Sequence, residues 1–164
     1  MTSITTPVLS PDALAEHVRT GMLANDRATQ GLGIHITAMG PGRATLTMVV
    51  RADMLNGFAT CHGGFITTLA DSAFAFACNS RNDMTVASGL SIDFLAPARE
   101  GDCLTADATE VSVAGRTGVY DVNVCNQRNE AIAVFRGRSY CLKGKATVPL
   151  AVAPDDGAVT SPRP

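Results

Sequence analysis

The sequence predicts an α+β fold in which an antiparallel sheet wraps around one long central helix. Residues 65–80 are apolar on almost every side, and a helix of that kind must be buried. Before and after this helix, segments of alternating apolar and polar residues are separated by short turns, as in strands joined by hairpins. One sheet can cover only one side of the helix, so we expect a second copy of the chain to cover the other side.

The elements before the central helix follow from capping and periodicity. A serine and a proline open a helix over residues 11–25, in which apolar side chains recur at four-residue spacing. Strands are expected at 34–38 and 43–50, joined by a glycine- and proline-containing turn at 39–42. Residues 52–62 are polar and irregular, and they connect this hairpin to the central helix.

The chain after the central helix is predicted to be all strand and turn. The expected strands lie at 85–95, 102–113, 117–127 and 131–142. We expect residues 1–10 and 144–164 to be flexible tails, the second being rich in proline, glycine and small residues. Residues 11–143 then form a single domain.

Composition narrows the classes of function. The chain has 164 residues and a net charge of −2, so nothing suggests nucleic acid or an anionic membrane as a partner. No apolar run is long enough to span a membrane. The five cysteines are odd in number and contain no CxxC pair, which argues against a disulfide framework and a structural zinc site. We therefore expect reduced thiols and a cytoplasmic protein.

Residues 55–80 carry the groups that could do chemistry. A Cys-His-Gly-Gly turn at 61–64 leads into the central helix. The start of a helix offers free N–H groups and the positive end of its dipole. Asp71 is the one ionisable residue inside the helix, so its carboxylate must be desolvated, hydrogen-bonded or directed at a cleft.

These residues resemble a known family. The segment MLNGFATCHGGFITTLADSAFAFACNS is similar to the signature of the PaaI-type thioesterases of phenylacetic acid degradation, which have the hotdog fold. The segments SIDFLAPAREGD, RTGVYDVNV and AVFRGRS resemble later parts of the same family, so the resemblance covers about residues 12–142. It implies an acyl-CoA thioesterase that hydrolyses aryl-acetyl thioesters as a homodimer or homotetramer, with no metal and no cofactor.

The resemblance also implies roles for four residues. Asp71 matches the family's catalytic carboxylate, and the backbone N–H of Gly64 matches the donor to the thioester carbonyl. Asn56 matches a residue that helps to hold the carbonyl or the attacking water, and His62 matches a histidine that shapes the turn. The chemistry agrees, because hydrolysis needs an oxyanion donor and an activated nucleophile. Asp71 could act as general base or attack directly, and both routes stay open.

The spacing of these residues predicts a site shared between subunits. Gly64 and Asp71 lie seven residues apart on one helix, which is about 10 Å along its axis. Both should come within about 3 Å of the reacting centre, which one helix cannot provide. We therefore expect Gly64 and Asn56 from one subunit to meet Asp71 from its neighbour.

Substrate contacts can be proposed from residue type. The absence of a side chain at Gly63 would let substrate approach the helix start, and an aromatic group would suit the acyl chain. The basic residues would suit the phosphates of CoA, although a single arginine is more often part of a solvated sheet edge. The candidates are Phe58, Phe65 and Phe74 for the acyl group, and Arg116, Arg136 and Arg138 for CoA.

Two positions depart from the family pattern. Phe58 stands where the family commonly has histidine, and Ala96 stands where an arginine would be expected. The first change could enlarge the apolar contact with the acyl group. The second removes a basic residue that could contact CoA, so both affect the choice of substrate rather than the class of reaction.

Alternative interpretations remain for these residues. Asp71 could be a structural carboxylate bonded to Thr67, Thr68 or Ser72, and the two glycines could serve only a tight helix entry. Cys61 lies beside the site but has no second histidine nearby in sequence to activate it. At the level of function, the rivals are an enoyl-CoA hydratase or dehydratase of the same fold and a non-catalytic acyl-CoA-binding oligomer. The hydratase motifs N-P-x-H and H-F-P-G are absent from the sequence.

Overall fold

The structure, a computed structural model, describes residues 9–150. Most of both expected tails, residues 1–8 and 151–164, therefore lies outside the described residues. In chain order the elements are α1 (Pro11–Asn25), α2 (Arg27–Gly31), β1 (His35–Gly40), β2 (Arg43–Val49), the short 3₁₀ helix η1 (Ala52–Met54), α3 (Gly63–Asn79), β3 (Asp83–Phe94), β4 (Cys103–Ala114), β5 (Thr117–Cys125) and β6 (Ala131–Ala146).

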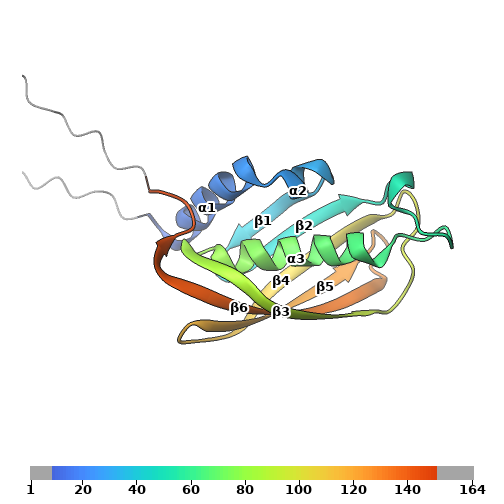
Figure 1. The fold of residues 1–164 in the computed structure, drawn as a ribbon. Coiled ribbons are helices and arrows are strands. Elements are labelled where there is room, and N and C mark those ends of the chain that lie inside the picture. Colours follow the sequence, from blue (N-terminus) through green and yellow to red (C-terminus); the bar gives the residue numbers. More distant parts are fainter. Residues whose placement is uncertain (1–8, 151–164) are drawn as a thin grey trace, which may run out of the picture.

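The strands form one antiparallel sheet in the order β1-β2-β4-β5-β6-β3. Figure 1 shows α3 lying across one face of this sheet, with α1 and α2 at the side of β1 and β2. The order leaves β1 and β3 as the two edge strands. This is the predicted α+β architecture of a sheet wrapped around a central helix.

The core lies between α3 and the sheet. The helix buries Leu69, Ala73 and Phe76 completely. The ring of Phe74 packs against Tyr120 on β5 and Phe135 on β6, with ring centroids 5.5 and 5.9 Å away. The buried apolar side chains of the helix and the sheet form one continuous cluster, so apolar burial holds the helix on the sheet.

The opposite side of α3 is not covered by any part of residues 9–150. Its residues are half-buried or exposed, and they recur at the three- and four-residue spacing of one helix face. This outward stripe consists of Gly64, Thr67, Thr68, Asp71, Ser72 and Ala75. The helix is therefore buried on one side only, and its outward stripe bears small and polar side chains.

The structure adds a short helix that the sequence did not predict. Residues 27–31 form α2, whose N-cap Asp26 accepts a hydrogen bond from the Thr29 N–H at 3.0 Å. A single capped turn of five residues has too few positions to show a helical period. The helix predicted over residues 11–25 therefore ended without revealing this extra turn.

The expected C-terminal tail begins later than residue 144. Strand β6 continues to Ala146, beyond the predicted end at residue 142. Val148 is buried, and its backbone N–H and C=O bond to the side chain of Asn82 at 2.9 and 3.0 Å. These contacts fix residues 147–148 against the domain, which a composition rich in small residues could not reveal. No described helix is both long and apolar enough to cross a membrane.

Candidate active site

The loop that precedes α3 is held together by the side chain of Asn56. Its Oδ1 accepts hydrogen bonds from the backbone N–H groups of Phe58 and Thr60 and from the Thr60 hydroxyl, at 2.9, 3.3 and 3.2 Å. Leu55 and Cys61 close the loop through an isolated β-bridge. Because these loop hydrogen bonds use the side-chain oxygen of Asn56, its side-chain NH₂ remains as a donor for a ligand.

His62 caps the start of α3. Its backbone is extended, and its Nδ1 accepts a hydrogen bond from the Gly64 N–H at 3.0 Å. This cap explains why the helix begins at Gly63, two residues earlier than its apolar run. The Gly64 N–H, predicted to point at a thioester carbonyl, therefore already has an acceptor within the chain.

A pocket of about 410 Å³ opens beside this helix start. It brings together Asn56 and Gly63, two of the predicted site residues. The remaining walls are mostly apolar and come from the helix start and the end of β3 with the segment after it. They are Thr60, Cys61, Ile66, Phe94, Leu95, Ala96, Pro97 and Ala98.

Phe94 and Leu95 are functional candidates that the sequence analysis missed. They are 51% and 55% exposed although large and apolar, and both line the pocket. Phe94 falls in the strand predicted at 85–95, but periodicity could not show that this strand ends beside the helix start. The adjacent Ala96, already noted as a departure from the family pattern, was the signal that could have drawn attention to this wall.

Gly63 packs against the end of β3. A Cβ at this position would lie 2.8 Å from Cζ of the Phe94 ring. Phe94 therefore covers the side-chain face of Gly63, which still lines the pocket, and the absence of a side chain allows β3 to pack against the helix start.

Asp71 lies on the outward stripe of α3, half-buried. The neighbouring hydroxyls of Thr67 and Thr68 donate instead to backbone carbonyls one turn earlier, each at 2.8 Å. Ser72 has its hydroxyl 3.4 Å from that of Thr29. Within the described part of the chain the Asp71 carboxylate accepts no hydrogen bond, and burial raises its pKa above the ordinary value of 3.8. These contacts argue against the interpretation of Asp71 as a structural carboxylate.

The three predicted aromatic contacts fall in different places. Phe58 is 88% exposed on the loop, and the half-buried ring of Phe65 stands edge-on to His62 at 6.4 Å. Phe74 is 1% exposed and packs in the core, so we no longer expect it to contact the acyl group. Burial raises the pKa of the Cys61 thiol, which disfavours the thiolate that a cysteine nucleophile needs.

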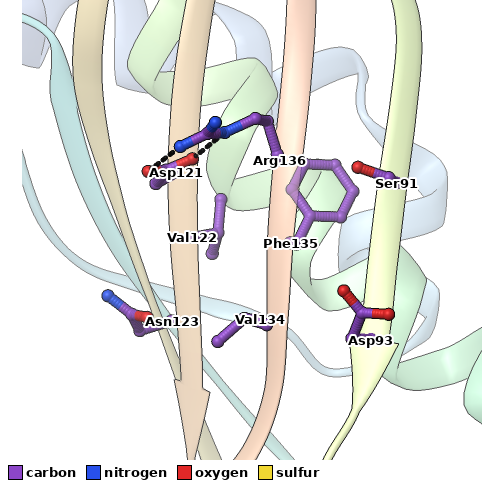
Figure 2. Close-up of a pocket in the computed structure, with 8 residues that line it drawn as sticks. All are labelled: Ser91, Asp93, Asp121, Val122, Asn123, Val134, Phe135 and Arg136. Carbon is purple, nitrogen blue, oxygen red and sulfur yellow. Dashed lines mark hydrogen bonds and ion pairs between the residues drawn. The ribbon is translucent and has the colours of Figure 1, made fainter.

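Arg136 lies on the face of the sheet that points away from α3. Figure 2 shows its guanidinium bonded to the carboxylate of Asp121 on the next strand, with Ser91 and Asp93 on β3 nearby. The two bonds measure 2.6 and 2.7 Å and lower the pKa of Asp121. The charge of Arg136 is therefore already paired within the chain, which weakens it as a contact for CoA.

The other two arginines also lie away from the pocket at the helix start. Arg116 donates to the Tyr140 hydroxyl at 3.1 Å and lines a second pocket that includes Cys78, at the far end of α3 from Gly64. Arg138 reaches across the backbone of β3. None of the three arginines lines the pocket that contains Asn56. Among residues 9–150, no three histidine, cysteine, aspartate or glutamate side chains form a group that could hold a metal ion.

Comparisons with known proteins agree with this architecture. A profile described as the thioesterase superfamily matches residues 58–133. The acyl-coenzyme A thioesterase PaaI of Escherichia coli (strain K12) is 48% identical over 126 residues, which cover 77% of this chain and 90% of the relative. A putative esterase of Archaeoglobus fulgidus is 39% identical over 127 residues, covering 77% of this chain and 82% of the relative.

Solved structures give the same result. The structure of the Escherichia coli PaaI protein from the phenylacetic acid degradation operon matches with a TM-score of 0.81 at 45% identity, over 83% of this chain and 99% of that one. A Streptococcus mutans protein solved bound to acetyl-CoA matches with a TM-score of 0.64 at 28% identity, over 66% of this chain and 87% of that one.

The sheet wrapped around a central helix is thus the hotdog fold of the thioesterase superfamily. Within that superfamily, the chain belongs to the PaaI-type thioesterases. It is an acyl-CoA thioester hydrolase, and the predictions of family, fold and reaction class are confirmed.

Proposed function

We propose that the protein hydrolyses aryl-acetyl-CoA thioesters, of the phenylacetyl and hydroxyphenylacetyl type, to the free acid and CoA. The likeness to a PaaI protein of a phenylacetic acid degradation operon supports this substrate class. The apolar walls of the pocket beside Asn56 suit an aryl group. The observation that carries the proposal is Asp71, a half-buried carboxylate on the same helix as the Gly64 amide, to which no group in residues 9–150 donates a hydrogen bond.

The proposed site is shared between two copies of the chain in a homodimer or homotetramer. Asp71 does not line the pocket that contains Asn56 and Gly63. The rise of α3 puts Gly64 and Asp71 about 10 Å apart along the axis, too far for both to reach one thioester carbon. A second copy that faces the outward stripe would bring its Asp71 to the pocket of the first copy, and the first copy would do the same for the second.

Strand β3 supports this assembly. It is an edge strand that exposes Val86, Leu90 and Phe94, by 46%, 40% and 51%. A long edge with apolar side chains invites pairing with another strand. β3 also runs the length of α3, because its start is bonded to Asn79 and its end covers Gly63. A copy docked on β3 would therefore lie alongside α3.

The proposed chemistry assigns one task to each group. The NH₂ of Asn56 and a backbone N–H at the start of α3 hold the thioester carbonyl and stabilise the oxyanion that forms. Asp71 of the other copy either takes a proton from the attacking water or attacks the carbonyl carbon itself. The C–S bond then breaks, and the CoA thiolate leaves and is protonated. In the direct route the acyl group is left on Asp71 as a mixed anhydride, which water hydrolyses to release the free acid and regenerate the carboxylate.

Substrate preference would follow from the pocket wall. Ala96 keeps this wall apolar where the family commonly has arginine. Phe58 and Phe65 do not line the pocket, but they lie close to it in sequence and remain candidates for contact with the aryl group. For the CoA phosphates, Arg116 and Arg138 are better candidates than Arg136, whose charge is paired with Asp121. The five free thiols support a cytoplasmic location, where cysteines stay reduced.

A thiol-release assay on a panel of acyl-CoAs tests the proposal. Phenylacetyl-CoA and hydroxyphenylacetyl-CoA should give the highest kcat/KM of the panel. Replacing Asp71 by alanine or asparagine should lower kcat by about 10²- to 10⁴-fold, because the activating carboxylate is lost. Near-wild-type turnover by Asp71→Ala would rule out the mechanism.

Thiol release, combined with two further measurements, separates the alternatives. An enoyl-CoA hydratase would change the absorbance of an enoyl thioester without releasing thiol. A non-catalytic acyl-CoA-binding oligomer would retain CoA thioesters through gel filtration and release no thiol from any of them.

A further inference from the structure

Asp102 is a buried carboxylate that the proposed mechanism does not use. It is 5% exposed and lies just before β4, in the segment that joins β3 to β4. Figure 1 shows this segment at the same end of the sheet as the start of α3. Because a buried carboxylate is costly unless it accepts hydrogen bonds, its partners indicate which parts of the molecule it holds in place.

Both oxygens of the Asp102 carboxylate are bonded. Oδ2 accepts from the backbone N–H of Arg99 at 2.8 Å, and the Asp102 N–H donates to the Arg99 carbonyl at 3.0 Å. Oδ1 accepts from the side chains of Gln127 and Arg128 in the turn between β5 and β6, at 2.9 and 3.2 Å. Gln127 also accepts from the Cys103 N–H at 3.0 Å. These hydrogen bonds, and first the one from Arg99, lower the pKa of Asp102.

The turn that Asp102 closes continues directly from the wall of the candidate active-site pocket. Ala98 lines that pocket and is fully buried, one residue before the bonded N–H of the turn. Its carbonyl accepts a hydrogen bond from the Cys61 N–H at 2.8 Å. Cys61 pairs with Leu55 across the isolated β-bridge of the loop. Bonded groups therefore lead from Asp102 through the pocket wall to the residue next to Asn56.

We propose that Asp102 is a positioning residue for the thioesterase site. Its carboxylate fixes the Ala98 carbonyl, which fixes Cys61, and the loop then directs the Asn56 NH₂ at the thioester carbonyl. The inference rests on the proposed role of Asn56 in binding that carbonyl. Because a displacement of about 1 Å can cost up to about 100-fold in rate, the carboxylate affects catalysis although it touches no substrate.

Two inert acyl-CoA analogues measure the carbonyl contact on the whole protein. In the first, a methylene replaces the thioester sulfur and the carbonyl is kept, which gives a ketone. In the second, the sulfur is kept and a methylene replaces the carbonyl, which gives a thioether. Partial unfolding weakens the binding of both analogues equally. The dissociation constant of the thioether divided by that of the ketone therefore reports the contact in the folded protein, which a merely structural role of Asp102 would not change.

Loss of the Asp102 carboxylate should lower this ratio. Asp102→Ala removes every hydrogen bond of the side chain, and we expect the ratio to fall about tenfold and kcat/KM to fall with it. Asp102→Asn can still accept from the Arg99 N–H but presents an NH₂ to the two donors of the β5–β6 turn, so its ratio should fall by less. The matched control is Asp107→Ala on the same strand. Asp107 is exposed and accepts from the Thr45 hydroxyl at 2.7 Å, so its variant should keep the wild-type ratio.

A double variant shows whether the effect passes through Asn56. Asn56→Ala lacks the proposed donor to the carbonyl, so adding Asp102→Asn to it should lower the ratio no further. If the added change lowers the ratio as much as it does in wild type, Asp102 does not act through Asn56 and the inference is wrong.

The outcomes also separate the inference from the proposed function. If wild type prefers the ketone and both Asp102 variants keep the wild-type ratio, Asp102 is only structural and the role of Asn56 stands. If wild type binds the ketone no more tightly than the thioether, Asn56 does not bind the carbonyl and both proposals fail. Should Asp102→Ala not fold, Asp102→Asn decides alone: a lower ratio supports the positioning role, and an unchanged ratio overturns it.

Discussion

Hydrogen bonds decide, at the scale of single residues, which groups near the helix start can meet a substrate. The Asn56 oxygen is used by its loop, and the hydroxyls of Thr67 and Thr68 are used by backbone carbonyls. The Asn56 NH₂ and the Asp71 carboxylate are left over, one in the pocket and one on the outward stripe. The sequence could name these residues, but it could not tell which of their atoms are already bonded.

The half-buried carboxylate of Asp71 should lower the stability of the fold at neutral pH. Burial raises its folded-state pKa above 3.8, so the folded chain holds the proton more tightly than the unfolded chain. Stability from this group is therefore present below the unfolded pKa and is lost as pH rises through the folded pKa. We expect Asp71→Asn to raise the Tm at pH 7, by a margin that shrinks to near zero at about pH 3.

Thermal unfolding followed by circular dichroism at several pH values measures this effect. Asp121→Asn is the matched control, because pairing with Arg136 lowers the pKa of Asp121 and gives the opposite sign. Its variant should lose stability at pH 7 and match wild type at low pH. A lower Tm for Asp71→Asn at pH 7 would mean that the carboxylate has a stabilising partner.

At the scale of elements, the contact between α3 and the sheet depends on a missing side chain. A Cβ on Gly137 of β6 would lie 2.8 Å from the ring atoms Cγ and Cδ2 of Phe74. Because the ring is also packed against Tyr120 and Phe135, it has little room to move. The glycine thus lets the helix lie close to the centre of the sheet.

Replacing Gly137 by alanine should therefore overpack the core. We expect a loss of about 1–3 kcal/mol in the free energy of unfolding, measured by urea titration. Gly31→Ala is the control, since a Cβ there meets nothing within 4 Å. Equal stability of the two variants would show that the core tolerates the added methyl group.

The elements themselves were largely predictable. Periodicity and turn residues gave every strand and the helix α1, whose cap Ser10 accepts from the Ala13 N–H as expected. The start of α3 was misplaced by two residues because a histidine cap carries no apolar signal. The short α2 and the last residues of β6 were missed. Local sequence does not reveal contacts between distant segments, such as the one by which Asn82 holds Val148 just beyond β6.

At the scale of the whole molecule, strand order decides what is exposed. Hairpin neighbours follow from the sequence, but the pairings of β2 with β4 and of β6 with β3 join distant segments. Those pairings leave β3 at an edge and bring Phe94 onto Gly63. Hydrophobic pattern alone could not predict this wall of the pocket, because it depends on which strands meet in space.

The central claim is that two copies of the chain share each active site, and co-expression of two inactive variants tests it most directly. Asp71→Ala keeps an intact helix start, and Asn56→Ala keeps an intact carboxylate. Hybrids purified through a different tag on each variant contain both chains. In a hybrid dimer one of the two sites is complete, so we expect thioesterase activity of about half the wild-type value per dimer. Hybrids as inactive as either variant alone would contradict the shared site.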